Sequence, residues 1–261
     1  MNVFSCYVDV ERFLGLPVEE LVRFLICLPY HRRISTIISI AEFFQYVDKV
    51  GEFIEFKKTK KEKFLETIPL NEHGKFKLWR LLKNFFLKHS ENLSGKEIPQ
   101  NDLIALRKGR LFEELVFHLG PINRKVVNLM CLHCQPMVNR RKLKVFCNKK
   151  NLSGKNIDVT FWGRNYVEGY ECKGNVEFFI RLGTGHSERS RKVREKILYL
   201  HLLSKELKKY FSDVNIYLAS FAPKIDMNFC IQKCKSWVNE YCGDEEIQFK
   251  IITINDFLKE I

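Results

Sequence analysis

The chain has 261 residues, 46% of them hydrophobic, and its 44 lysine and arginine side chains outnumber 31 acidic ones, for a formal net charge of +13. This length supports one large domain or two small ones with a substantial core. Charged residues interrupt the longest apolar stretch, Val22 to Phe44, and no secretion signal opens the chain, so we expect a cytoplasmic protein without a membrane span.

The positive charge is concentrated in the middle of the chain. Residues 101–200 carry 20 basic and 9 acidic side chains, whereas residues 201–261 carry 8 and 9. Clustered lysine and arginine neutralise phosphates, so this distribution favours a nucleic-acid partner over charge that serves only solubility.

The nine cysteines are an odd number and lie mostly within apolar patterns. We therefore expect reduced thiols that act as small core residues. Two sets offer zinc ligation as a lesser alternative, although neither forms a paired CxxC arrangement. The sets are Cys131, His133, Cys134 and Cys147, and Cys230, Cys234 and Cys242.

Residues 1–100 are predicted to form a mostly helical N-terminal domain. Apolar residues recur at helical spacing after Pro17, from about Ile34 to Val50 and from about Lys75 to His89, while 53–56 suggests a short strand. Helices with a short strand and a basic loop fit a winged-helix-like DNA reader or a cap on the second domain. No recognition-helix signature is present, which favours the cap.

The second domain, residues 101–261, is predicted to begin with a helix from about Leu103 to Leu119 that carries two adjacent acids, Glu113 and Glu114. A strand follows at 126–132 or at 143–147. Four basic residues at 140–144 would grip a phosphate backbone from an exposed hairpin, or simply face solvent. They are Arg140, Arg141, Lys142 and Lys144.

A β-hairpin is predicted at 157–162 and 166–173, joined by the turn residues 163–165. Because side chains alternate along a strand, Glu171 and Lys173 point to one side and Cys172 to the other. The hairpin brings Glu171 back beside Asp158. Two carboxylates and an ammonium suit phosphodiester cleavage, since hard oxygen ligands hold Mg²⁺ and a lysine neutralises developing charge.

After a loop containing Gly183, Thr184 and Gly185, to which we attach no cofactor, a long helix is expected at 187–211 with a basic first half. Cations oppose the dipole there, so a bound phosphate backbone is one explanation for them. A strand at 213–221, a helix at 227–241 and a strand at 249–254 before a short helix then predict parallel pairing with right-handed crossovers, and thus an α/β domain.

Asp158 followed by Glu171-Cys172-Lys173 resembles the PD-(D/E)XK nuclease superfamily, with Ile157 in place of the proline. The resemblance implies a restriction-endonuclease-like core, a mixed central sheet flanked by helices. It implies that the main-chain carbonyl of Cys172 and a glutamate of the preceding helix join Asp158 and Glu171 in binding metal, and Gly109 with Phe112 favours Glu113 over Glu114. It also suggests a supporting role for Lys192 or Lys196 on the long helix.

The predicted function is therefore a Mg²⁺- or Mn²⁺-dependent endonuclease with Asp158, Glu171 and Lys173 as catalytic residues. The residues of the motif are most similar to those of restriction and CRISPR-associated antiviral defence nucleases. By this resemblance we expect DNA rather than RNA as the substrate. A homodimer is expected if both strands are cut. The alternatives are a catalytically silent nucleic-acid-binding subunit of the same fold, and an interaction protein whose 22 phenylalanines cover a partner.

Overall fold

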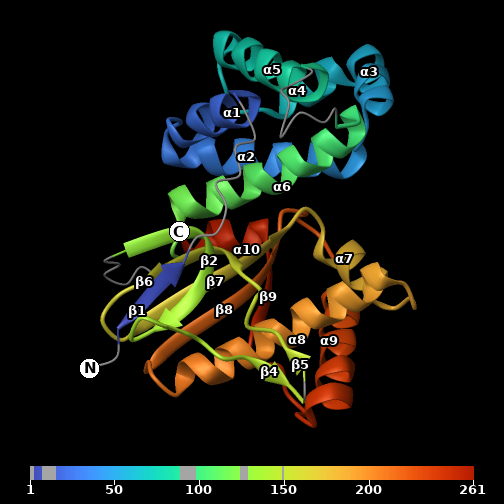
Figure 1. Ribbon diagram of the computed structural model, residues 1–261. Coiled ribbons are helices and arrows are strands. Elements are labelled where there is room, and N and C mark those ends of the chain that lie inside the picture. The colour runs from blue at the N-terminus through green and yellow to red at the C-terminus, as the bar shows by residue number, and fades with distance from the viewer. Residues whose placement is uncertain (1–2, 8–15, 89–97, 124–128, 149) are drawn as a thin grey trace. The chain divides into compact units, whose positions relative to one another are not determined.

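A computed structural model of the protein describes residues 3–7, 16–88, 98–123, 129–148 and 150–261 (Figure 1). The chain forms two compact units, Arg12–Leu119 and a second one made of Met1–Glu11 with Gly120–Ile261. This division differs from the predicted boundary near residue 100. Among the described helices, none has the length and apolar character needed to cross a membrane.

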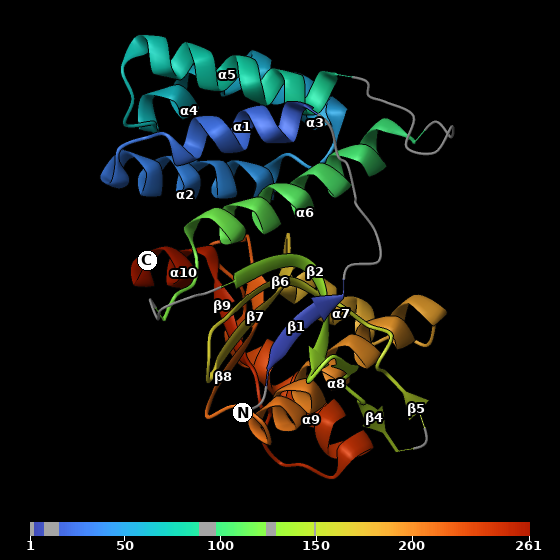
Figure 2. The same cartoon turned by 60° about the vertical axis from the view of Figure 1, so that its left-hand side comes forward.

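The first unit is helical over its described residues. Its elements are α1 (Leu16–Ile26), α2 (Tyr30–Tyr46), α3 (Val50–Thr59), α4 (Lys61–Thr67), α5 (Glu72–Leu87) and α6 (Gln100–Leu119). Helix α1 contacts α2, α5 and α6 (Figure 2). Aromatic rings fill the core between the helices, and Phe53 stacks on Phe86 with ring centroids 4.7 Å apart. We name this unit the helical unit.

Two buried cations explain why α6 belongs to the helical unit. Lys108 Nζ donates to the carbonyls of Phe44 and Val47 at 2.9 and 2.7 Å, and Arg107 donates to the carbonyl of Phe85 at 2.5 Å. These carbonyls lie at or just beyond the C-terminal ends of α2 and α5, where helices lack internal partners. Burial lowers the pKa of Lys108, although Asp48 acts in the opposite direction.

The strand predicted at 53–56 is wrong, because these residues lie in the middle of α3. Glu52 fixes the start of that helix by accepting from the backbone N–H groups of Asp48 and Lys49 at 2.6 and 3.1 Å. Phe53 is buried and Ile54 is exposed, which fits a helix packed on one side. The winged-helix alternative used this strand and loses its support.

Over its described residues the second unit contains a seven-stranded mixed sheet in the order β1-β2-β6-β7-β8-β9, with β3 paired to β2. We name it the sheet unit. The predicted hairpin is confirmed, since β6 and β7 pair antiparallel, and so are the parallel pairings β7–β8 and β8–β9. The bounds are β1 (Phe4–Tyr7), β2 (Leu129–Val138), β3 (Arg141–Lys142), β6 (Ile157–Trp162), β7 (Tyr166–Lys173), β8 (Asp213–Ser220) and β9 (Lys250–Thr253).

Of the two alternatives for the first strand, 126–132 is nearer to the observed β2, although residues 124–128 lie outside the described part of the chain. The other alternative, 143–147, contains only β4 (Phe146–Cys147), which pairs with β5 (Lys150–Asn151) in a separate two-stranded sheet. The N-terminal strand β1 was not predicted. It pairs antiparallel with β2 and so joins the sheet unit.

Helices cover both faces of the sheet (Figure 1). Helices α7 (Val176–Gly183), α8 (Glu188–Lys208) and α9 (Met227–Cys242) share the main apolar core with one face, while α10 (Ile254–Glu260) brings Phe257 against Tyr170 on the other. The sheet unit is therefore α/β. Where only a loop was expected after Lys173, α7 begins at Val176, and the side chain of the preceding Asn175 caps it by accepting from Phe178 N–H at 3.0 Å.

A disulfide between Cys6 and Cys134 joins β1 to β2. The expectation of reduced thiols is wrong for this pair. It rested on the odd number of cysteines and the apolar patterns around them, and neither signal reveals that β1 pairs with β2. Cys134 is consequently not available to the first zinc set. Of the second set, Cys242 instead lies 3.8 Å from Cys147, measured between sulfur atoms.

Candidate active site on β6, β7 and α8

The predicted acids meet on one face of the sheet. Pairing of Val159 with Tyr170 places Asp158 beside Glu171 on the neighbouring strand, and residues at paired positions share a face. The N–H of Cys172 donates to Asp158 Oδ2 at 2.8 Å, which fixes that carboxylate at the edge of β7. The hairpin therefore positions both acids as the sequence predicted.

Two lysines approach these acids from different elements. Lys173 Nζ, at the end of β7, donates to Glu171 Oε1 at 2.5 Å and to the Cys172 carbonyl at 2.9 Å, and lies 3.5 Å from Asp158 Oδ2. Lys196 Nζ, in α8, donates to Glu171 Oε2 at 2.8 Å and to the Asn156 carbonyl at 2.9 Å. The structure thus brings Asp158, Glu171 and Lys173 together and adds Lys196.

Burial makes this charge cluster electrostatically strong. Asp158 is 8% exposed and Glu171 is 1% exposed. Burial alone would raise the pKa of Asp158, but Lys173, Lys196 and the Cys172 N–H outweigh it and hold the pKa below its usual value. Burial alone would lower the pKa of Lys173, but Asp158 and Glu171 outweigh it and raise the pKa. Both groups are therefore ionised at neutral pH.

His133 is a further polar side chain beside Asp158. Strand β2 pairs Leu132 with Val159 and Cys134 with Ile157, so His133 lies across from Asp158 at a break in the ladder with a positive φ of 52°. A His133 ring nitrogen and an Asp158 carboxylate oxygen lie within 4.8 Å of each other. In the sequence analysis His133 appears only as a possible zinc ligand. Its place beside Asp158 is set by the register of β2, which the sequence does not reveal.

Tyr199 lies three residues after Lys196 on α8. Its hydroxyl is buried and finds no hydrogen-bond partner among the described residues. Burial, and then the charge of Glu171, raise the pKa of this phenol. This neutral buried hydroxyl, close enough to Glu171 to feel its charge, can donate a hydrogen bond to a bound ligand or water. The sequence offered only the i, i+3 spacing from Lys196 as a signal.

The two lysines of α8 that the sequence suggested as supporting residues differ in exposure and in their partners. Lys192 is exposed and pairs with Glu188 at 3.0 Å, while Lys196 contacts Glu171. Nor does the basic first half of α8 require a phosphate backbone to explain it. Arg194 donates to the Gly183 and Gly185 carbonyls, at the end of α7, so protein groups already stabilise this cation as they do Lys196.

The two glutamates proposed from the preceding helix lie on α6. Arg110 pairs with Glu113 at 3.3 Å and with Glu114 at 2.6 Å, and Glu114 lies 3.6 Å from His118. Neither acid is exposed. The role of Glu113, rather than Glu114, as a metal ligand stays a prediction.

The four-residue basic cluster before the hairpin is exposed. Strands β2 and β3 pair through Met137–Lys142 and Val138–Arg141 around a turn at Asn139 and Arg140. Arg140, Arg141, Lys142 and Lys144 all face solvent. We name them the β2–β3 basic cluster; its contact with a phosphate backbone stays a prediction.

The donor set fits a hard divalent cation. Asp158 and Glu171 supply carboxylate oxygens, and the Cys172 carbonyl oxygen accepts from the same ammonium that bridges both acids. Such oxygens suit Mg²⁺ or Mn²⁺, and a nitrogen of His133 is a further ligand that Mn²⁺ accepts.

Comparison of the chain with protein-family models and with curated proteins gave no match.

Proposed function

We propose that this protein is a metal-dependent nuclease with a restriction-endonuclease-like core, belonging to the PD-(D/E)XK superfamily. The observation that carries the proposal is the meeting of Asp158, Glu171 and Lys173 on one face of a mixed sheet, within hydrogen-bond range of the shared ammonium. The mixed sheet flanked by helices supports it, since this is the architecture that the motif implies.

Asp158 and Glu171 would hold Mg²⁺ or Mn²⁺ together with the Cys172 carbonyl, and Glu113 is the predicted further ligand. When bound, the cation supplies positive charge beside the phosphate oxygens and lowers the pKa of water. Asp158 and Glu171 raise the pKa of Lys173, so in the protein without metal this side chain is a charged hydrogen-bond donor. It would orient the attacking water and stabilise charge on the phosphate.

The substrate proposed is nucleic acid, with DNA preferred over RNA on the strength of the motif. The β2–β3 basic cluster presents four exposed cations on the sheet unit, which suits contact with a phosphate backbone. The resemblance to restriction and CRISPR-associated enzymes makes antiviral defence the proposed setting, in the cytoplasm, and a homodimer the proposed assembly for cutting both strands.

A second candidate is a catalytically silent nucleic-acid-binding subunit of the same fold. The observation that favours it is the charge balance of the site: two ammonium groups already contact the two carboxylates. A cluster balanced in this way can serve the fold alone. In that case the basic surface binds nucleic acid and a partner supplies the chemistry.

Incubation with a panel of nucleic-acid substrates separates these two functions. Purified protein is incubated with supercoiled plasmid, linear duplex DNA, single-stranded DNA and single-stranded RNA, each in Mg²⁺, Mn²⁺ and EDTA. The nuclease predicts cleavage in metal that EDTA abolishes, and the polymer cut fastest identifies the substrate. Binding of the same polymers in EDTA without cleavage in either metal would favour the silent subunit.

A further inference from the structure

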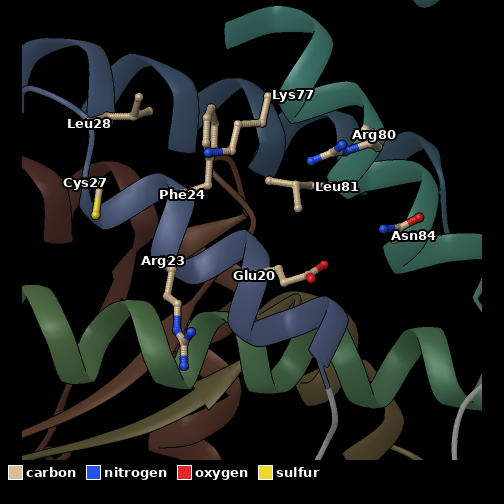
Figure 3. A pocket seen from close by; sticks show the side chains of 9 residues that line it. All are labelled: Glu20, Arg23, Phe24, Cys27, Leu28, Lys77, Arg80, Leu81 and Asn84. Atoms are coloured by element: carbon tan, nitrogen blue, oxygen red, sulfur yellow. The ribbon is translucent and has the colours of Figure 1, made fainter.

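A groove on the helical unit lies between α1 and α5, on a surface not used by the proposed active site. It has a volume of about 680 Å³. Its wall combines the apolar side chains of Phe24, Leu28 and Leu81 with three basic ones, and Glu20 is the acid among its lining residues. Figure 3 shows Lys77 and Arg80 reaching from α5 toward α1, with Leu81 and Phe24 between the helices.

Two of the basic side chains have no acidic partner in the part of the chain that the structure describes. Among the described residues, no ion pair involves Lys77 or Arg80, both of which are exposed. Lys77 Nζ lies 5.6 Å from the centre of the Phe24 ring. The third cation, Arg23, pairs with Glu19 at 3.8 Å and points away from Lys77 and Arg80 in Figure 3. The groove therefore presents an aromatic ring beside Lys77, with Arg80 in the same lining, and neither cation forms an ion pair among the described residues.

This combination fits a ligand that is flat and apolar at one end and anionic at the other. A nucleotide unit has this character, since its base stacks on aromatic rings while its phosphates bind cations. The bases of a duplex are stacked inside the helix, so a single strand is the form that presents them. An acidic side chain of a peptide would pair with Lys77 or Arg80, but it brings no flat ring to stack on Phe24, which is half-buried.

We propose that the α1–α5 groove binds single-stranded nucleic acid, with a base against Phe24 and the backbone phosphates on Lys77 and Arg80. The inference rests on the proposed function for the kind of polymer, and it assigns the helical unit a role in holding one strand. The earlier interpretation of this region as a passive cap did not include such a site.

The test is the affinity of the full chain for a fluorescein-labelled single-stranded oligonucleotide, measured by anisotropy in EDTA so that no cleavage occurs. Phe24→Ala and Arg80→Gln probe the groove. Phe76→Ala and Lys83→Gln are matched controls, because both residues are exposed on α5 and neither lines the groove. We expect each groove variant to weaken binding about 5- to 30-fold, from the loss of one stacked base or one phosphate contact, and each control about twofold at most.

Two further measurements separate a groove contact from a folding defect. Phe24→Tyr keeps a stacking ring and should retain affinity within about twofold of the parent chain. Cys27 lines the groove and is exposed, so bound oligonucleotide should slow its alkylation by N-ethylmaleimide, read by mass spectrometry. Unchanged affinity in both groove variants, or unprotected Cys27 at saturating oligonucleotide, would overturn the proposal.

Competitors distinguish the other occupants. A mononucleotide or an acidic amphipathic peptide that protects Cys27 where the oligonucleotide does not would assign the groove to that ligand and overturn the strand proposal. Comparing the binding series with metal-dependent cleavage by the parent chain separates the groove proposal from the nuclease proposal. If the parent chain cleaves nucleic acid but the groove variants bind the oligonucleotide as tightly as the parent, only the groove proposal is refuted. Groove-dependent binding without cleavage in any metal would refute only the nuclease.

Discussion

The Nζ atom of Lys196 lies 2.8 Å from Oε2 of Glu171 and joins the middle of α8 to the end of β7. Lys173 contacts the other oxygen of the same carboxylate at 2.5 Å. Glu171 is thus held between two ammonium groups in a setting that excludes most water. A divalent cation must compete with at least one of them, so we expect the protein without nucleic acid to bind Mg²⁺ weakly.

Lys196→Met tests this competition. Removing one ammonium leaves Glu171 with a single cationic partner and the Asn156 carbonyl without its donor, which should cost about 1–3 kcal/mol of stability in urea unfolding. The same change should tighten Mn²⁺ binding several-fold in titration calorimetry, because one competing charge is gone. Lys192→Met, one turn earlier and exposed, should alter neither quantity. Weaker Mn²⁺ binding by Lys196→Met would show that the lysine does not compete with metal.

Glu168 lies on the opposite face of β7 from Glu171 and is fully buried. It accepts from Ile122 N–H at 2.8 Å and from Asn123, Tyr166 and Tyr170. Glu168→Gln would place an amide donor against this set of donors. We expect a loss of about 2–4 kcal/mol in the free energy of unfolding, and about 1 kcal/mol for the control Tyr166→Phe. Equal stability of the glutamine variant and the parent would contradict this.

The Cys6–Cys134 disulfide closes a loop across a sequence separation of 128 residues. Reduction should therefore lower the unfolding free energy by about 2–5 kcal/mol, because the unfolded chain regains freedom. The midpoint of urea unfolding with and without a phosphine reductant measures the effect. The double variant Cys6→Ala/Cys134→Ala should show no response to reductant. If the parent is also insensitive, the disulfide does not form in solution.

His201 makes stability depend on pH. Its ring accepts from Gln248 N–H at Nδ1, 3.2 Å, so in the neutral form the Nε2–H donates to Asp244 at 2.7 Å. Burial lowers the pKa of His201, although Asp244 acts in the opposite direction. The folded state thus takes up its proton at a lower pH than the unfolded state, whose pKa is about 6.5. Stability is full above that pH and falls as pH drops toward the folded pKa.

The check is urea unfolding between pH 5 and pH 7.5. The parent should lose stability on acidification more steeply than His201→Gln, which has no imidazole to titrate. His118→Gln is the matched control, because His118 is partly exposed, and it should follow the parent. Parallel curves for the parent and His201→Gln would show that another group carries the pH dependence.

The hairpin and the parallel strands were predictable because their signals are local. Alternating apolar residues and a polar turn define β6 and β7, and the side-chain period of two then places Asp158 and Glu171 together. Lys196 was one of two candidates on α8. Helical periodicity puts Lys192 and Lys196 on the same side of the helix, and only the packing of α8 on the sheet shows which of them reaches Glu171. His133 was missed as a neighbour of Asp158 because a break in the β2 ladder sets its position.

Long-range pairings account for the remaining errors. Strand β1 has four residues and becomes a strand by pairing with β2 far along the chain, which also unites Cys6 with Cys134. Arg107 and Lys108 contributed to the basic excess that suggested nucleic acid, yet both are buried and cap helix ends. Charge counts along a sequence do not separate such structural cations from a binding surface.

The most direct test of the central claim is the rate of Mn²⁺-dependent cleavage by Asp158→Asn, measured on the polymer that the parent chain cuts fastest. Glu188→Gln is the control, because Glu188 is an exposed acid on α8 that pairs with Lys192, and no ion pair among the described residues joins it to the acids or lysines of the site. If Asp158 holds the metal, its amide should lower the rate by at least about 100-fold while circular dichroism shows a folded chain, and the control should cut at the parent rate. Cleavage by Asp158→Asn at the parent rate would contradict the assignment of this site.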